Sequence, residues 1–370
     1  MRVLMVSKAC IVGIYQRKLE YIAQQGIDLL TLVPSSWQDE RGEQLLERVY
    51  TKGYRLQEMP IARNGHFHTH FYPRLQDYIA EFDPDIVHID EEPYNLATWQ
   101  ALLFARLART KTLFFSWQNI NRSYPPPFSW GERWVLNSVD YALVGTDSAG
   151  EVWRDKGYKG KMRTIPQFGT DHHLFKPATQ TIQRPFTIGY IGRLVEEKGI
   201  HHLLEACTML EQDWRMRIVG SGPLRDDLED LADELHIAEH IQWIEWVAST
   251  EMPAQYQELD VLVLPSLTRP NWKEQFGRVL IEAMASGIPV IGSDSGAIPS
   301  VIGNGGLTFP EGDVEQLAKH LHDLQTKADL REILGKAGRQ RVLDNFTHER
   351  IAEATVEVYR EMRPSLYRYH

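Results

Sequence analysis

The sequence predicts an α/β protein made of two doubly wound domains, each built on a parallel sheet. Short apolar runs rich in β-branched residues alternate with amphipathic segments in both halves of the chain. At 370 residues and 43% hydrophobic content, the chain is too long for one ordinary domain. Prolines and glycines between residues 166 and 185 punctuate the chain where the two halves meet.

The predicted strands give both halves the same rhythm. In the first half the apolar runs are 2–7, 28–34, 85–90, 111–117, 141–146 and 162–166. In the second half they are 186–192, 214–220, 241–246, 261–266, 289–294 and 306–309. We therefore predict an N-terminal domain over residues 1–166 and a C-terminal domain over 167–346. An amphipathic pattern at 347–363 predicts that the segment 347–370 packs back on the first domain.

Composition indicates a soluble, globular protein. No run of 18 or more apolar residues occurs, and the N-terminal stretch does not have the pattern of a signal peptide, so we expect a cytoplasmic location. The two cysteines, Cys10 and Cys207, fall in different predicted domains and form no CxxC pair. We therefore expect neither a disulfide nor a cysteine metal site.

The net charge of −10 is unevenly distributed. Residues 1–168 hold 20 basic and 19 acidic side chains, which leaves 20 basic and 31 acidic ones for the rest. The acidic second half argues against a nucleic-acid partner. The near-neutral first half leaves open a peripheral association with the inner face of an anionic membrane.

The most informative stretch runs from Glu274 to Glu282, where two carboxylates eight positions apart bracket a Phe-Gly turn that opens a helix. Gly277 allows close approach of the backbone, and a helix start offers free N–H groups to a diphosphate. The two glutamates supply acceptors for sugar and ribose hydroxyls. Gly287-Ile-Pro then ends the helix before the next strand. This unit predicts a nucleotide-sugar site.

A second motif follows the first strand of the second half. Gly192 and Arg193 stand at the end of that strand, and Lys198 follows five positions after the arginine. Carboxyl ends of strands are where ligands bind in open α/β sheets, so both cations are suited to neutralising a diphosphate. The alternative is that they are solvated charges on a loop. The glycines of Val219 to Pro223 are interpreted as supporting architecture.

These motifs together resemble the retaining glycosyltransferases of family 4 (glycosyl transferases group 1). That family has the GT-B fold, in which two Rossmann-like domains face a central cleft. The resemblance spans most of residues 186–312 in the family's order, through Gly192-Arg193, Glu197 to Gly199, Val219 to Pro223, Ala254 to Ser266, Glu274 to Gly292, and Gly305 to Asp313.

The resemblance implies a role for each matching residue. Arg193 and Lys198 would hold the donor diphosphate, and Glu274 would contact the donor sugar. Glu282 would contact the ribose, and the backbone near Trp246 and Val247 would meet the base. The phosphates and sugar would meet the backbone of four consecutive residues, Phe276, Gly277, Arg278 and Val279.

The resemblance also implies the reaction: a hexosyltransferase moves a sugar from a nucleoside diphosphate to an acceptor hydroxyl by front-face attack with retention. Catalysis is then mainly electrostatic, with Arg193 and Lys198 stabilising the leaving diphosphate. Neither a metal nor another cofactor is required. The acceptor is expected to be a polysaccharide, a glycolipid or a small molecule.

The first half departs from the family pattern in two places. Instead of a glycine-rich loop after the first strand, it has the single Gly13, which we predict to approach the donor. The family's histidine after the fourth strand is absent, and Ser116, Trp117 or Asn119 is expected to line the cleft instead. In the second half, the residues where a glycine and a glutamate are commoner in the family are Ala297 and Ser300.

Three further features of the first half suggest acceptor contacts. Glu91 and Glu92 follow the third strand and are predicted to orient the acceptor hydroxyl, although such carboxylates also cap helices or face solvent. The alternating His66, His68 and His70 have the spacing of a strand face that binds a metal, but no carboxylate or cysteine completes the set, so a polar loop is favoured. Residues 121–134 predict an aromatic loop that contacts sugar or lipid, or serves packing alone.

Three rival functions share parts of this pattern. A nucleotide-sugar epimerase of the same fold would need acid/base groups near the sugar, and a dehydrogenase would need a GxGxxG turn after the first strand. A non-catalytic nucleotide-sugar binding protein is the third rival, because the usual first-domain histidine is missing.

Overall fold

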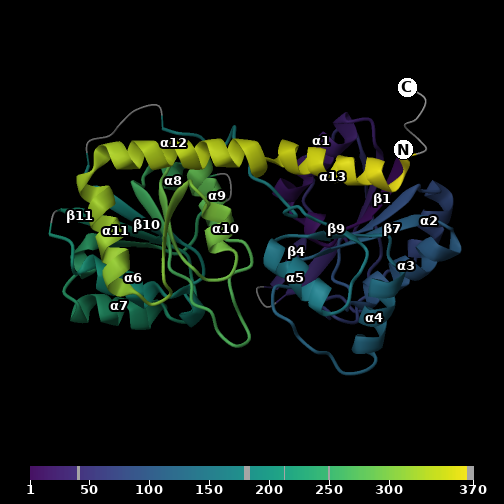
Figure 1. Ribbon diagram of the computed structural model, residues 1–370, viewed down its shortest axis with the longest axis horizontal. Coiled ribbons are helices and arrows are strands. Elements are labelled where there is room, and N and C mark those ends of the chain that lie inside the picture. Colours follow the sequence, from purple (N-terminus) through teal and green to yellow (C-terminus); the bar gives the residue numbers. More distant parts are fainter. Residues whose placement is uncertain (40–41, 179–183, 212, 249–250, 365–370) are drawn as a thin grey trace. The chain divides into compact units, whose positions relative to one another are not determined.

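The computed structural model describes residues 1–39, 42–178, 184–211, 213–248 and 251–364, and the chain forms two compact units (Figure 1). One unit comprises residues 1–169 and 348–370, and the other comprises 170–347. The boundary lies three residues after the predicted one at 166. Gln167 and Phe168 remain with the first unit because Lys18 donates to the Gln167 carbonyl at 2.7 Å and Tyr15 stacks on Phe168 at 4.0 Å.

The first unit is built on a seven-stranded parallel sheet with the order β5-β2-β1-β6-β7-β8-β9. In the central strands, Val3 pairs with Leu29 on one side and with Ile86 on the other. The strands are β1 (Arg2–Val6), β2 (Asp28–Val33), β5 (Arg55–Glu58), β6 (Ile86–Ile89), β7 (Lys111–Ser116), β8 (Tyr141–Val144) and β9 (Lys161–Thr164).

Helices cover both faces of this sheet (Figure 1). Because side chains alternate along a strand, Val3 and Met5 pack under α1 (Arg17–Gln24) and α13 (His348–Met362), whereas Leu4 and Val6 face the opposite layer. That layer consists of α2 (Leu75–Phe82), α3 (Leu96–Leu107), α4 (Phe128–Ser138) and α5 (Asp147–Asp155). The C-terminal helix α13 therefore completes the first unit.

Three features of the first unit differ from the sequence-based expectation. The edge strand β5 was not predicted, because its residues are mostly exposed and polar and so form no apolar run. The small antiparallel hairpin of β3 (Ser36–Asp39) and β4 (Gly42–Leu45) was missed for the same reason. The expectation of a loop throughout 121–134 was wrong, because α4 begins at Phe128 and buries Glu132, Val135 and Leu136.

The second unit has a six-stranded parallel sheet with the order β12-β11-β10-β13-β14-β15. The order reverses between β10 and β13, so the carboxyl ends of these two strands form the topological switch point where ligands bind in open α/β sheets. The strands are β10 (Phe186–Ile191), β11 (Trp214–Val219), β12 (Ile241–Ile244), β13 (Val261–Leu264), β14 (Val290–Ser293) and β15 (Gly306–Phe309). Two parallel-sheet domains, as predicted, are confirmed.

Helices also form two layers in the second unit (Figure 1). One face of the sheet is covered by α6 (Ile200–Cys207), α7 (Arg225–Glu234) and α11 (Val314–Thr326). The other helices are α8 (Met252–Gln257), α9 (Arg278–Ala285), α10 (Ile298–Ile302) and α12 (Ala328–Asn345), and α9 packs between the sheet and α12. The 3₁₀ helices are η1 (Ala9–Ile11), η2 (Gly13–Gln16), η3 (Glu196–Lys198) and η4 (Ala238–His240). Within the described residues, no helix combines the length and apolar character needed to cross a bilayer.

Candidate functional site

The predicted site residues of the second unit lie on the loops that leave β10 and β13. Gly192, Arg193 and Lys198 follow β10, and Glu274 and Gly277 follow β13. The two strands are neighbours in the sheet and run in the same direction, so these loops emerge together at the switch point.

Lys198 and Glu274 form an ion pair at this edge. The Lys198 Nζ atom lies 2.5 Å from Oε2 of Glu274, and the same oxygen accepts a hydrogen bond from Ser266 Oγ at 3.0 Å. The exposed fractions of the two side chains are 17% and 10%. The Lys198 ammonium also lies over the ring of Trp272, 4.9 Å from its centroid. A cation and an anion that are largely shielded from solvent therefore hold each other in place at the switch point.

Two glycines fix the backbone around this pair. Gly199 has a φ of +62°, and a Cβ there would lie 2.2 Å from the Pro265 carbonyl oxygen. Gly296 has a φ of +55°, and a Cβ there would lie 2.1 Å from the Glu274 carbonyl oxygen. Only glycine combines these conformations with such close approach. The loops after β10 and β14 are thus locked against the loop that carries Glu274.

Arg193 is an available cation at the same edge. Its side chain is exposed, and its guanidinium makes no hydrogen bond or ion pair with the described residues. Its backbone is held in place, because Tyr190 Oη donates to the Arg193 carbonyl at 2.7 Å and Leu194 N donates to Ser221 O at 3.0 Å. The preceding Gly192 is half-buried in this loop. A fixed backbone with an uncommitted guanidinium suits an incoming anion.

The start of α9 supplies a second feature suited to anions. Gly277 is the N-cap in a left-handed conformation, with a φ of +75°, and no side chain caps the helix there. The first turn of a helix carries partial positive charge, so the start of α9 at Arg278 and Val279 is electropositive at this end. Phe276 is buried, with its ring 5.7 Å from that of Phe346. The loop before the helix is thereby anchored.

Glu282 lies one turn into α9 and is held from two sides. Its Oε1 accepts from Arg278 Nε at 2.8 Å, and its Oε2 accepts from Tyr256 Oη at 2.7 Å. The residue is buried, with 8% of its surface exposed. Tyr256 was not singled out by the sequence reasoning, since nothing in its spacing marks a partner 26 residues away. Glu282 therefore presents an oriented carboxylate.

Trp246 and Val247 follow β12. Trp246 is 78% exposed, and Val247 is half-buried. The structure therefore places them on a surface loop at the same carboxyl edge of the sheet, beyond β11 when counted from β10. That their backbone groups contact the base of the donor stays a prediction.

In the first unit, Glu91 is enclosed by partners. Its carboxylate accepts from Lys8 Nζ at 3.0 Å, Tyr72 Oη at 3.2 Å and Asn95 Nδ2 at 3.3 Å, and His70 Nε2 lies 3.5 Å away. Burial alone would raise the pKa of Glu91, but the charges of Lys8 and His70 outweigh it and lower that pKa to about 2. Glu91 thus acts as the centre of an internal network.

Glu92 has a different environment. It accepts hydrogen bonds from Ser116 Oγ at 2.5 Å and from the backbone N–H of Trp117 at 2.8 Å. Burial raises the pKa of Glu92 to about 7, more than these hydrogen bonds lower it. The Trp117 indole donates to Gln167 Oε1 at 2.8 Å. Glu92 therefore organises the loop that follows β7.

Gly13 and Asn119 are less open than the sequence suggested. The Gly13 N–H donates to Glu47 Oε2 at 2.7 Å, and a Cβ at Gly13 would lie 2.3 Å from Val49 Cγ2. The missing side chain therefore makes room for the chain's own segment 47–49. Asn119 is 3% exposed and lies inside the unit.

A buried polar network at the carboxyl ends of β1 and β6 was not predicted from the sequence. Lys18 donates to Gln167 O at 2.7 Å, and Gln167 Nε2 donates to Asp90 Oδ1 at 2.9 Å. Ser7 Oγ donates to Asp90 Oδ2 at 2.5 Å. Burial lowers the pKa of Lys18 and raises that of Asp90. The members are too far apart in sequence for any spacing to have joined them.

The three histidines at 66–70 do not form a strand face. They lie in a turn region, where His70 is buried with its Nδ1 atom 2.9 Å from the Phe67 carbonyl oxygen. His68 packs against the rings of Tyr94 and Tyr124, at 5.4 and 5.8 Å. Among the described residues, no three histidine, cysteine or acidic side chains are placed to hold a metal ion.

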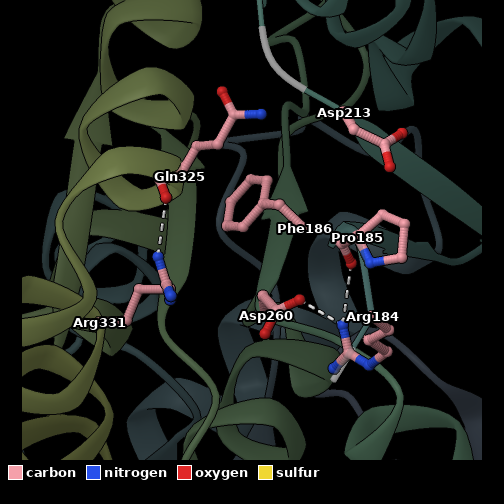
Figure 2. A pocket seen from close by; sticks show the side chains of 7 residues that line it. All are labelled: Arg184, Pro185, Phe186, Asp213, Asp260, Gln325 and Arg331. Carbon is pink, nitrogen blue, oxygen red and sulfur yellow. Dashed lines mark hydrogen bonds and ion pairs between the residues drawn. The ribbon is translucent and has the colours of Figure 1, made fainter. Parts of the chain in front are cut away.

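Two cavities lie at opposite edges of the second sheet. One, of about 330 Å³, lies at the amino ends of β10, β11 and β13, where Arg184 pairs with Asp260 and Arg331 donates to the Gln325 carbonyl at 3.0 Å (Figure 2). The other, of about 560 Å³, lies at the carboxyl edge and is lined by Gly220, Ser221, Gly222, Arg225, Asp226, Glu229, Trp243 and Glu245. This second cavity shares the edge of the sheet with the predicted site residues.

Comparisons with known proteins cover both units. The family model described as "Glycosyl transferases group 1" matches residues 174–341, and that described as "Glycosyltransferase Family 4" matches residues 17–168. The chain is 34% identical over 186 residues to spore coat protein SA of Bacillus subtilis, which covers 47% of this chain and 48% of that protein. It is 27% identical over 296 residues to sulfoquinovosyl transferase SQD2 of Arabidopsis thaliana, which covers 72% of this chain and 55% of that protein.

The matched segments thus span about half the length of these curated relatives. Among solved structures, HepE of Anabaena in complex with UDP aligns with a TM-score of 0.73 at 16% identity. That alignment covers 98% of this chain and 100% of the Anabaena chain. At this identity the likeness establishes the fold.

Proposed function

The chain belongs to the group 1, family 4 glycosyltransferases with the GT-B fold, and from that premise we propose that it moves a sugar from a nucleoside-diphosphate sugar to an acceptor hydroxyl. We propose a hexosyl transfer with retained anomeric configuration, by front-face attack. The observation that carries the proposal is the Lys198–Glu274 ion pair at the switch point of the second sheet.

The leaving diphosphate would be stabilised by groups that are fixed before it arrives. Arg193 offers an uncommitted guanidinium, Lys198 offers an ammonium, and the start of α9 offers backbone N–H groups. Preorganised donors of this kind stabilise charge that grows in the transition state, and losing one commonly costs about 10²- to 10³-fold in rate. Holding both substrates in place lowers the entropic part of the barrier.

Glu274 and Glu282 would orient the donor. Both are buried carboxylates with hydrogen-bond partners that fix their direction, which suits them to accept from sugar and ribose hydroxyls respectively. When a donor hydroxyl approaches Glu274, Lys198 holds the carboxylate in a fixed direction, so the pair serves both phosphate neutralisation and sugar positioning.

We propose that the reaction needs no metal ion, because two cationic side chains and a helix start can supply the charge that a divalent ion supplies in other transferases. Activity should therefore persist in excess EDTA. A complete loss that added Mg²⁺ or Mn²⁺ restores would contradict this part of the proposal.

We assign the acceptor, a polysaccharide, glycolipid or small molecule, to the first unit. Glu92 and Trp117 at the carboxyl ends of β6 and β7 are the proposed contacts, whereas Glu91 and Asn119 act from inside as supports. Glu91 and Asn119 were predicted to contact the acceptor, and we now propose that they position the residues that do.

We propose a cytoplasmic protein that associates peripherally with the inner face of a membrane. Helices α3 and α4 pack together, and their exposed apolar side chains include Leu103, Leu107 and Trp130, which are 46%, 68% and 67% exposed. Arg133, also exposed on α4, contributes a positive charge. Flotation with vesicles rich in anionic lipid would test this, and Trp130→Ser should reduce co-flotation.

A direct assay tests the proposed function. Purified protein is incubated with a panel of nucleoside-diphosphate sugars and mixed acceptors, and release of the nucleoside diphosphate is followed by coupled assay, with product anomers assigned by NMR. Binding without acceptor-dependent release would favour the non-catalytic binding protein. Interconversion of the sugar without transfer would favour the epimerase.

A further inference from the structure

The 560 Å³ cavity of the second unit has hydrogen-bonding groups of both kinds in its wall, and Ser221, Asp226 and Glu245 among them are exposed to solvent. The carboxylates of Asp226 and Glu245 make no hydrogen bond or ion pair with the described residues, and neither do the backbone N–H groups of Ser221 and Gly222. Arg225 by contrast is committed, since it pairs with Glu229 and lies 4.5 Å over the Trp243 ring.

The cavity is placed where the far end of a bound nucleotide would lie. Its glycine loop packs on the loop that carries Arg193, since Leu194 N donates to Ser221 O at 3.0 Å and a Cβ at Gly222 would meet the Leu194 carbonyl oxygen at 2.3 Å. β12 lies two strands from β10 in the sheet, a distance of roughly 10 Å at the usual strand spacing. A nucleoside attached to a diphosphate at β10 can span that distance.

The carboxylates and backbone N–H groups that line the cavity favour some nucleotide bases over others. A carboxylate accepts hydrogen bonds through two oxygens, so it is matched by two adjacent donors on the edge of a base. Guanine presents N1–H and N2–H₂ side by side, with the O6 acceptor next to them for a backbone N–H. Uracil presents one N–H between two carbonyl oxygens, and those oxygens would face the carboxylate with like charge.

We propose that this cavity is the base-recognition site of the donor and that it selects guanine, so that the donor is a GDP-sugar. Glu245 receives N1–H and N2–H₂, and the Ser221–Gly222 backbone donates to O6. Asp226 adds negative potential that disfavours the carbonyl oxygens of uracil. This inference rests on the proposed function, because it names the base of the proposed donor.

Isothermal titration calorimetry with GDP, UDP, ADP and CDP tests the assignment. We expect GDP to bind about 10- to 100-fold more tightly than UDP, the range that one bidentate contact to a base provides. Glu245→Gln keeps the size of the side chain but removes its charge, so it should weaken GDP binding, relieve the repulsion of the uracil oxygens and reduce the GDP-over-UDP ratio by about 10-fold. Asp226→Asn should lower the ratio less.

Asp230→Asn is the matched control, because Asp230 is an exposed carboxylate of α7 outside the cavity and loses the same charge. It should keep the wild-type ratio. A wild-type protein that binds UDP as tightly as GDP overturns the guanine assignment, and so does a ratio unchanged in Glu245→Gln. Acceptor-dependent transfer from a UDP-sugar would overturn this inference and leave the proposed function standing. No binding of any nucleotide would overturn both.

Discussion

Lys198 and Glu274 are 76 positions apart in the sequence, yet the lysine ammonium lies 2.5 Å from the glutamate Oε2 atom at the carboxyl edge of the second sheet. The pair joins the loop after β10 to the loop after β13, and Ser266 holds the same carboxylate oxygen. Arg193, on the same loop as Lys198, has no such partner among the described residues. The two cations should therefore respond differently to substitution.

Arg193→Ala should reduce kcat/KM for transfer by about 10²- to 10³-fold while changing the free energy of unfolding by less than about 0.5 kcal/mol, because the exposed guanidinium supports nothing in the folded protein. Lys198→Ala should lose activity to a similar extent and also be destabilised by about 1–3 kcal/mol, because it leaves Glu274 shielded without its cation. Urea unfolding and steady-state kinetics measure both. If Arg193→Ala and Lys198→Ala had equal free energies of unfolding, the Lys198–Glu274 ion pair would not contribute to stability.

Tyr256→Phe should raise KM for the donor more than it lowers kcat. The hydroxyl donates to Glu282 Oε2 at 2.7 Å inside the unit, so its loss frees the carboxylate that we assign to ribose binding, at a stability cost of about 1 kcal/mol. Donor saturation curves separate the two constants. A fall in kcat with KM unchanged would mean that Glu282 acts in the transition state instead.

Gly296→Ala should destabilise the second unit by more than about 2 kcal/mol and abolish transfer, because the new Cβ would lie 2.1 Å from the Glu274 carbonyl oxygen at a φ of +55°. Gly157→Ala provides the matched control. Gly157 also has a positive φ, +93°, but nothing lies within 4 Å of its Cβ position, so only the backbone strain of about 1 kcal/mol applies. Similar unfolding midpoints for the two variants would contradict this prediction, because they would mean that the backbone at Glu274 moves away from the new Cβ at little cost.

The stability contribution of Glu92 should depend on pH in the opposite sense to that of most carboxylates. Its pKa is raised from 4.5 to about 7 by burial, so the folded state holds the proton that the unfolded state has lost. Its contribution is fully present below pH 4.5 and is lost as the pH rises to about 7. Glu92→Gln removes this titration.

Urea midpoints at pH 5 and pH 8 test this prediction. The wild type should lose more stability between these values than Glu92→Gln does. Glu91→Gln is the control, since the pKa of Glu91 is lowered from 4.5 to about 2 and its contribution is lost only as the pH falls from 4.5 toward 2, so this variant should lose as much stability between pH 5 and pH 8 as the wild type does. Identical slopes for wild type and Glu92→Gln above pH 5 would contradict the raised pKa.

The sequence by itself determined the two-domain α/β fold and the positions of the buried strands. Strands such as β1 and β13 are buried on both faces, so they must be continuous apolar runs, which a pattern of residues displays directly. The edge strand β5 has no such run, because exposed positions do not need apolar side chains. The positions of Arg193, Lys198 and Glu274 could also be predicted, since each stands near a strand end or a helix start that local patterns mark.

Tertiary structure alone decided which of these side chains are available and which are occupied. Glu91 and Glu92 are adjacent in sequence, yet the first is surrounded by Lys8, Tyr72 and Asn95 and the second by Ser116 and the Trp117 backbone. Likewise, nothing local indicates that Gly13 accommodates Val49 or that Tyr256 orients Glu282. Local sequence encodes secondary structure through periodicity and caps, whereas charge, burial and hydrogen bonding depend on segments that only folding brings together.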